Sequence, residues 1–178
     1  MWKTLNSETL IEDYHLTVHK NSVQLNNGSV IEDFYTVTIP DASMICALTP
    51  DGKVLLKTEY RYACNDEVIE CPAGMFNQDE TDPLIVAKRE LLEETGYESS
   101  DWTYLGSTYE STSKLTNKMH LFLAKECVKT SSQNLDINEI IDVKVIDLKT
   151  AVEMVMNGTI KANSTAHLIL KVDKLLNH

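Results

Sequence analysis

The chain has 178 residues, of which 43% are hydrophobic and 24% are charged, an ordinary balance for a globular protein of one domain or one domain with a small appendage. Its formal net charge of −11 argues against a nucleic-acid backbone as its main partner, because nucleic-acid-binding proteins usually carry a basic face. No apolar run reaches the roughly 18 residues of a membrane span, and the first residues do not resemble a secretory signal, so neither is expected.

The first 40 residues predict a small antiparallel β unit. Residues 8–39 alternate between apolar and polar side chains, and Asn-Asn-Gly-Ser at 26–29 is typical of a hairpin turn. Pro50-Asp51-Gly52 predicts a second hairpin between 43–49 and 53–62. A short strand at 66–74 follows and is ended by Pro72 and Gly74.

The periodicity then changes to that of a helix between Pro83 and Thr95. Asp82 is a suitable N-cap, Pro83 suits the first turn, and Gly96 suits the C-terminal stop. The apolar residues at helical spacing are Leu84, Ala87, Leu91 and Leu92.

The remaining sequence predicts three more strands, at 103–111, 119–128 and 140–148, and two closing helices, at roughly 149–156 and 164–176. Strands joined by hairpins and mixed with a few helices indicate an α+β fold that packs sheet against helix. The four cysteines form no CxxC pair and lie in or beside apolar segments, so we expect buried, reduced thiols and a cytoplasmic protein.

Three glutamates on the predicted helix, Glu90, Glu93 and Glu94, fall together on the side opposite the apolar residues and would repel one another at its surface. Arg89, four residues before Glu93, relieves part of this repulsion. Such a cluster is either a solvated acidic face or a site for a divalent cation, since hard cations bind carboxylate and carbonyl oxygens. The bend at 72–74 could direct a backbone carbonyl to the same place.

The stretch 74–97 resembles the Nudix box, in which glycine, five residues, glutamate and seven residues precede Arg-Glu-apolar-any-Glu-Glu-any-Gly-apolar. Residues 89–97, "RELLEETGY", match the second half in full, and Gly74 and Glu80 match the first half. The chain departs from the pattern by one residue, because "TDPLIVAK" places eight residues between Glu80 and Arg89. Loops accept such insertions readily.

The resemblance extends to the ADP-ribose pyrophosphatase and nucleotide-sugar hydrolase branch through "LTPDGKVLLKTEYRY" and "VIECPAG". It implies a Nudix domain at 41–178, with a mixed sheet between helices, and an N-terminal β unit at 1–40 that exchanges across a homodimer. It also implies a pyrophosphohydrolase that cleaves a nucleoside diphosphate linked to another moiety, ADP-ribose or a nucleotide sugar.

The resemblance also implies a site. Glu90, Glu93, Glu94 and the carbonyl of Ala73 would bind Mg²⁺, with Mn²⁺ as an alternative, and Arg89 would orient a glutamate of the box. The general base of this branch often lies between the later strands.

In this chain, we predict Glu139 as the general base, with Asp136 second. Arg61, Glu59 and Lys114 are the predicted substrate-binding residues. The loop "STSKLTNKMHLF" lacks the Ser-Pro-Gly of ADP-ribose enzymes and has Asn117 where they carry an acid, which weakens the case for ADP-ribose itself.

Two alternatives stay open at this stage: a regulatory Nudix module that binds a nucleotide without cleaving it, and a hydrolase of damaged nucleoside triphosphates. The retained carboxylates argue against the first, and the extra N-terminal sheet argues against the second.

Overall fold

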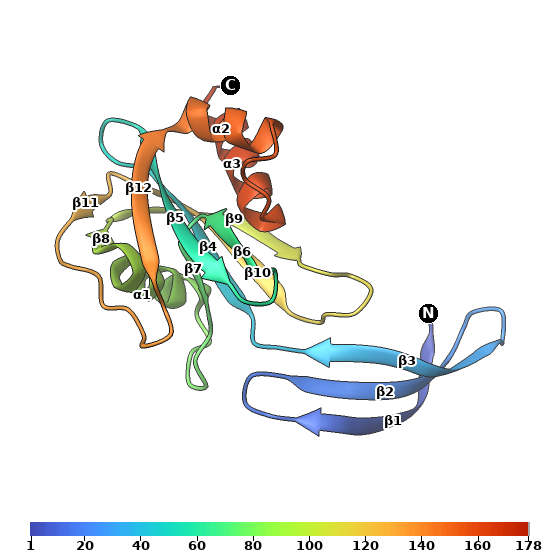
Figure 1. Ribbon diagram of the computed structural model, residues 1–178. Helices are drawn as coiled ribbons and strands as arrows, with labels where there is room; N and C mark the ends of the chain where they lie inside the picture. The colour runs from blue at the N-terminus through green and yellow to red at the C-terminus, as the bar shows by residue number, and fades with distance from the viewer. Residues whose placement is uncertain (178) are drawn as a thin grey trace. The chain divides into compact units, whose positions relative to one another are not determined.

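The computed structural model describes residues 1–177, which form two compact units (Figure 1). The first contains residues 1–41 and 109–118, and the second contains 42–108 and the described residues from 119 onward. Residues 109–118 contact the first unit through an isolated β-bridge between Val37 and Leu115. Sequence periodicity does not predict a contact between segments so far apart in the chain.

The first unit is an antiparallel sheet of β1 (Lys3–Glu12), β2 (Thr17–Gln24) and β3 (Val30–Thr38) in that order. The predicted hairpin turn between β2 and β3 contains Gly28, whose φ of 88° favours glycine. Every residue of β1 is exposed, including the apolar Leu5, Leu10 and Ile11.

The second unit contains three small sheets and three helices. The sheets have the strand orders β7-β4-β10-β9, β12-β5-β6 and β11-β8, with β4 parallel to β10, so the strands are mixed as expected. The strands are β4 (Ala42–Ala47), β5 (Lys53–Arg61), β6 (Asp66–Glu70), β7 (Ala73–Met75), β8 (Tyr97–Glu98), β9 (Asp101–Tyr109), β10 (Lys118–Lys125), β11 (Val128–Lys129) and β12 (Ile141–Asp147).

The three helices are α1 (Pro83–Thr95), α2 (Leu148–Met156) and α3 (Asn163–Leu176). The predicted ends of α1 are confirmed, since the side chain of Asp82 accepts a hydrogen bond from Leu84 N and Gly96 adopts a left-handed conformation. The predicted strand 66–74 is instead two strands, β6 and β7, because Cys71 and Pro72 interrupt the pairing.

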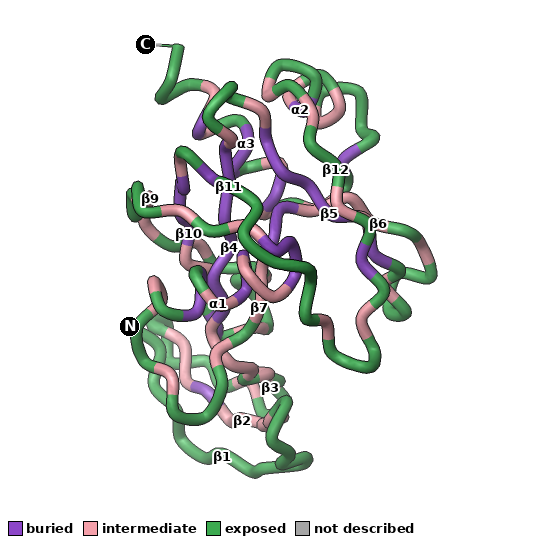
Figure 2. The backbone as a smooth tube through the Cα atoms, turned by 90° about the vertical axis from the view of Figure 1, so that its left-hand side faces the viewer, coloured by how far each residue is buried: buried purple, intermediate pink, exposed green. Residues whose placement is uncertain are grey.

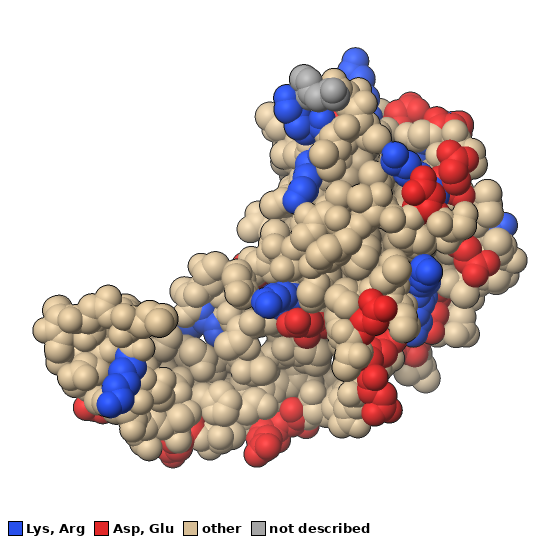
Figure 3. Space-filling model, turned by 180° about the vertical axis from the view of Figure 1, so that it is seen from behind, with Lys and Arg blue, Asp and Glu red and all other residues tan. Residues whose placement is uncertain are grey.

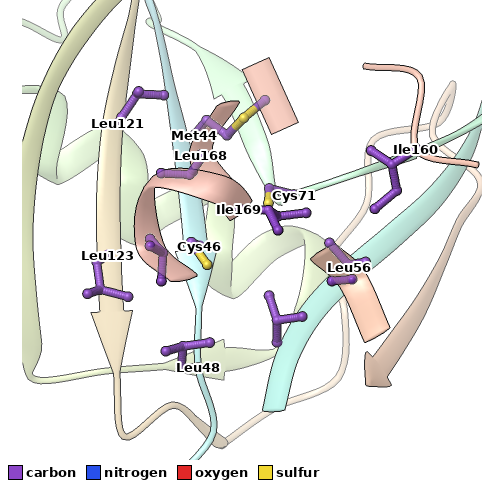
Figure 4. Close-up of a cluster of buried hydrophobic side chains, with 13 residues drawn as sticks. Met44, Cys46, Leu48, Leu56, Cys71, Leu121, Leu123, Ile160, Leu168 and Ile169 are labelled. Atoms are coloured by element: carbon purple, nitrogen blue, oxygen red, sulfur yellow. The ribbon is translucent and has the colours of Figure 1, made fainter. Parts of the chain in front are cut away.

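Two apolar layers hold the second unit together, on opposite faces of its sheets. Alternate residues of β4 point to opposite faces, as strand geometry requires: Met44 and Cys46 pack with α2 and α3, whereas Ile45 packs with α1. Figure 4 shows the first layer, in which Leu168 and Ile169 of α3 face the strands. The buried backbone in Figure 2 follows these central strands. The predicted α+β arrangement, with mixed strands packed between helices, is therefore confirmed.

The cysteine prediction is partly wrong. Cys46, Cys71 and Cys127 are buried free thiols, but Cys64 is exposed because it lies in the turn between β5 and β6. Among residues 1–177, no helix combines the length and apolarity needed to cross a bilayer. On the face shown in Figure 3, acidic and basic side chains are interspersed.

Candidate active site

Arg89 connects helix α1 to the loop before it. Its guanidinium donates to Glu80 through Nε and Nη2, both at 2.9 Å, and to the Met75 carbonyl at 3.1 Å. Its Nη1 donates to Glu90 Oε1 at 2.6 Å and to Glu93 Oε2 at 3.0 Å. These hydrogen bonds lower the pKa of Glu80 and raise that of Arg89. The additional residue before Arg89 therefore does not prevent Glu80 from reaching it.

Glu90 lies against the chain bend that precedes α1. Its side chain is largely buried, and a Cβ placed on Gly74 would be 2.0 Å from its Cδ and Oε1. Burial raises the pKa of Glu90, and the nearby Arg89 opposes that rise. Only a glycine at position 74 leaves room for the carboxylate in this position.

Glu94 is the most deeply buried glutamate of the helix, with 2% of its surface exposed. Its Oε1 forms an ion pair with Lys57 Nζ, and its Oε2 accepts a hydrogen bond from Ala73 N at 3.0 Å. Burial raises the pKa of Glu94 to about 7, against the opposing effect of Lys57. The expectation that all three glutamates stand at the surface is wrong, because β5 and β7 cover Glu90 and Glu94.

Three charged side chains of β5, those of Lys57, Glu59 and Arg61, lie side by side on one face of the strand. Glu59 Oε2 lies 3.3 Å from Lys57 Nζ and 3.2 Å from Arg61 Nη2. Arg61 also donates to Glu70 through Nε at 2.9 Å and Nη2 at 2.6 Å. The predicted substrate residues Glu59 and Arg61 thus contact each other and, through Lys57, are connected to the helix.

Lys57 was not among the residues predicted from sequence, although one signal was available. Lys57, Glu59 and Arg61 occur at every second position of β5, which places three charges on one face of the strand. The partner of Lys57 on α1, Glu94, is 37 positions away in sequence, so local periodicity does not reveal it.

The segment that carries Glu139 is hydrogen-bonded to the last turn of α1. Asn134 N donates to the Glu93 carbonyl at 2.8 Å, and Gln133 Nε2 donates to the carbonyls of Glu94 at 2.7 Å and Ile141 at 3.2 Å. The Glu139 side chain is half-buried, and its carboxylate accepts a hydrogen bond from Asp136 N. The fold therefore attaches this loop to the glutamate-bearing helix.

Lys114, a predicted substrate residue, belongs to the first unit. Its Nζ lies 5.1 Å from the centroid of the Phe34 ring, within the range of a cation–π interaction. Its role toward a substrate stays a prediction.

The donor atoms beside Gly74 suit a hard divalent cation. Among residues 1–177, no three His, Cys, Asp or Glu side chains form a ligand group. Glu90 and Glu94 are nevertheless close enough for the charge of Glu90 to raise the pKa of Glu94, and Ala73 can add its carbonyl oxygen. Mg²⁺ commonly uses one or two carboxylates and completes its shell with water and substrate phosphates, so this set fits it.

Comparisons with known proteins agree with this geometry. Residues 38–168 match the NUDIX domain, and residues 2–37 match the nucleoside diphosphate sugar hydrolase N-terminal domain. A solved structure titled "Crystal structure of ADP compounds hydrolase" superposes with a TM-score of 0.83 at 21% identity and covers 99% of this chain and 94% of its own. That likeness supports the fold.

Three curated relatives match over nearly the whole chain. The ADP-ribose pyrophosphatase of Bacillus subtilis (strain 168) is 29% identical over 94% of this chain and 90% of its own length. The methanol dehydrogenase activator of Bacillus methanolicus is 28% identical over 99% and 96%. The GDP-mannose pyrophosphatase of Escherichia coli (strain K12) is 27% identical over 93% and 92%.

Proposed function

The chain belongs to the Nudix family, and we propose that it hydrolyses the pyrophosphate bond of a nucleoside diphosphate linked to a sugar or ribose moiety. The observation that carries this proposal is the arrangement of Arg89, Glu90 and Glu94 against the bend at Ala73 and Gly74. The match of residues 2–37 to the nucleoside diphosphate sugar hydrolase N-terminal domain supports the substrate class.

In this proposal, Glu90, Glu94 and the Ala73 carbonyl hold Mg²⁺ or Mn²⁺, and Glu93 lies beside them. The bound cation would neutralise the charge that builds on the leaving phosphate. Arg89 keeps Glu90 and Glu93 at fixed positions through its hydrogen bonds, and Ala73 N does the same for Glu94. Pre-positioning of this kind is the main contribution a protein makes to phosphoryl transfer.

Glu139 is the proposed general base. It would take a proton from the attacking water as the new P–O bond forms and the bond to the bridging oxygen breaks, leaving a nucleoside monophosphate and a sugar phosphate. Its loop is attached to the last turn of α1, so it can act on the same substrate that the helix binds. Arg61, Glu59 and Lys114 are the proposed substrate-binding residues.

We also propose a homodimer formed through the first unit. The apolar side chains of β1 are exposed, and β1 is an edge strand of its sheet. Deletion of residues 1–40 should therefore give monomers in sedimentation analysis, and a dimer that persists would contradict this part of the proposal.

A second candidate is a regulatory module that binds a nucleotide without cleaving it. One relative, which matches nearly the full chain, is named a methanol dehydrogenase activator. Because that name describes an effect on another protein, it favours a regulatory role. Cleavage distinguishes the two candidates, because only the enzyme releases a nucleoside monophosphate.

The test is incubation with Mg²⁺ and a panel of ADP-ribose, nucleotide sugars, dinucleoside polyphosphates and nucleoside triphosphates. We expect monophosphate release from ADP-ribose or a nucleotide sugar. Glu93→Gln should lower the rate strongly, because it removes a carboxylate beside the proposed metal site. The variant should stay folded, because the Glu93 side chain is only partly buried. Glu153→Gln, on the exposed side of α2, is the matched control. Nucleotide binding without cleavage would favour the regulatory module.

A further inference from the structure

Lys57 is a charged side chain in the interior of the second unit. Only 1% of its surface is exposed, and it lies on β5 directly after two buried leucines, Leu55 and Leu56. Buried lysines are rare unless they are paired with acids. Lys57 has two such partners, Glu94 of α1 and Glu59 of its own strand.

The contacts of Glu94 leave little of its carboxylate unused. One oxygen is paired with the Lys57 ammonium, and the other accepts the hydrogen bond from Ala73 N. The Lys57 ammonium contacts two carboxylates, those of Glu94 and Glu59, and both contacts favour its charged form.

Glu59 Oε2 lies beside Lys57 and Arg61 as an ion-pair partner. Its Oε2 is buried and, within residues 1–177, accepts no hydrogen bond, although the cationic nitrogens of Lys57 and Arg61 are 3.3 and 3.2 Å away. A buried carboxylate oxygen without a hydrogen bond is costly. Its presence is explained if it balances a lysine whose main contact is elsewhere, at Glu94.

We propose that Lys57 acts as an internal cation that positions Glu94 and weakens the binding of divalent cations to this carboxylate in the absence of substrate. The inference rests on the metal site of the proposed function. A fixed ammonium group on one carboxylate oxygen repels a second cation and occupies one of the positions at which it would bind. Tight binding of the divalent cation then requires the additional negative charge of a pyrophosphate substrate.

The test compares a double variant, whose net interior charge equals that of the parent chain, with a single variant that retains the lysine; urea denaturation of each checks that it is folded. Lys57→Met combined with Glu59→Gln removes one positive and one negative buried charge, and Glu59→Gln alone retains the lysine. The protein is titrated with Mn²⁺ alone. Calorimetry and the electron-spin-resonance signal of free Mn²⁺ each give the affinity for Mn²⁺ in the absence of substrate. We expect the double variant to bind Mn²⁺ at least tenfold more tightly than Glu59→Gln.

Lys53→Met is the matched control, because it removes a lysine from the same strand at an exposed ion pair with Asp51. Its Mn²⁺ affinity should equal that of the parent chain. Equal or weaker Mn²⁺ binding by the double variant than by Glu59→Gln would overturn the inference.

The outcomes for this inference and for the proposed function are separable. If the parent chain hydrolyses a nucleoside diphosphate compound but the double variant gains no Mn²⁺ affinity, the inference alone fails. If no compound is hydrolysed and the double variant still gains affinity, the inference holds and the proposed enzyme activity fails.

Discussion

Gly74→Ala tests whether the position of the Glu90 carboxylate determines activity. The backbone at Gly74 does not adopt a left-handed conformation, so alanine fits the chain itself. Its Cβ would lie 2.0 Å from Glu90 Cδ, whereas ordinary contacts begin at 3.4 Å, so the carboxylate must move by about 1.4 Å. The atoms that must move are the far end of a flexible side chain.

A displacement of about 1 Å in an active site can cost on the order of 100-fold in rate. We therefore expect the kcat/KM of Gly74→Ala to fall about 100-fold, which corresponds to ~2.7 kcal/mol of transition-state stabilisation. The free energy of unfolding should change by less than about 1 kcal/mol, because alanine also restricts the unfolded chain. Steady-state kinetics and urea denaturation measure the two quantities.

A double-mutant cycle isolates the cause. In a Glu90→Ala background the clash is absent, so Gly74→Ala should bring no further loss of activity or of Mn²⁺ affinity. Parental activity in Gly74→Ala, or an equal loss in both backgrounds, would refute the argument that Gly74 acts by making room for Glu90.

Three further predictions concern buried charge and thiol chemistry. Lys57→Met alone should lower the free energy of unfolding by about 3–5 kcal/mol in urea denaturation, because it leaves buried carboxylates without their cation; a loss below about 1 kcal/mol would contradict this. Glu94→Gln should lower the melting temperature by roughly 6–12 °C, on the basis of about 3 kcal/mol for a broken buried pair; an unchanged or raised value in calorimetry would mean that surface repulsion dominates. Cys64, the exposed cysteine, should react rapidly with a thiol reagent at pH 7.5, whereas the other three thiols should react only on unfolding, because burial raises their pKa values; more than one rapid thiol would contradict the burial of the others.

The sequence predicted those features whose causes are local. Helix α1 has the expected ends because Asp82 and Gly96 act within their own turn of the chain. The predicted turns at Gly28 and Gly52 likewise have the positive φ angles that favour glycine. The sequence also showed that three glutamates share one side of α1.

Features that depend on distant partners were not predicted. A helical pattern shows which residues share a side, but not which strand covers that side, so the burial of Glu90 and Glu94 was missed. Gln133 was also missed, since its amide joins two backbone carbonyls in segments that only the folded chain brings together.

The ion pair between Lys57 and Glu94 also constrains how the protein can evolve. Loss of the lysine in one step makes the net buried charge more negative, whereas loss of Lys57 and Glu59 together leaves the net buried charge unchanged. Glu94 cannot change without loss of the proposed metal ligand, so the freedom to vary lies in the pair on β5. Among descendants of a common ancestor, we expect a neutral residue at position 57 to be inherited together with a neutral residue at position 59. The two sites would thus change as one unit of selection, and an intermediate with only the first change would be purged for its instability.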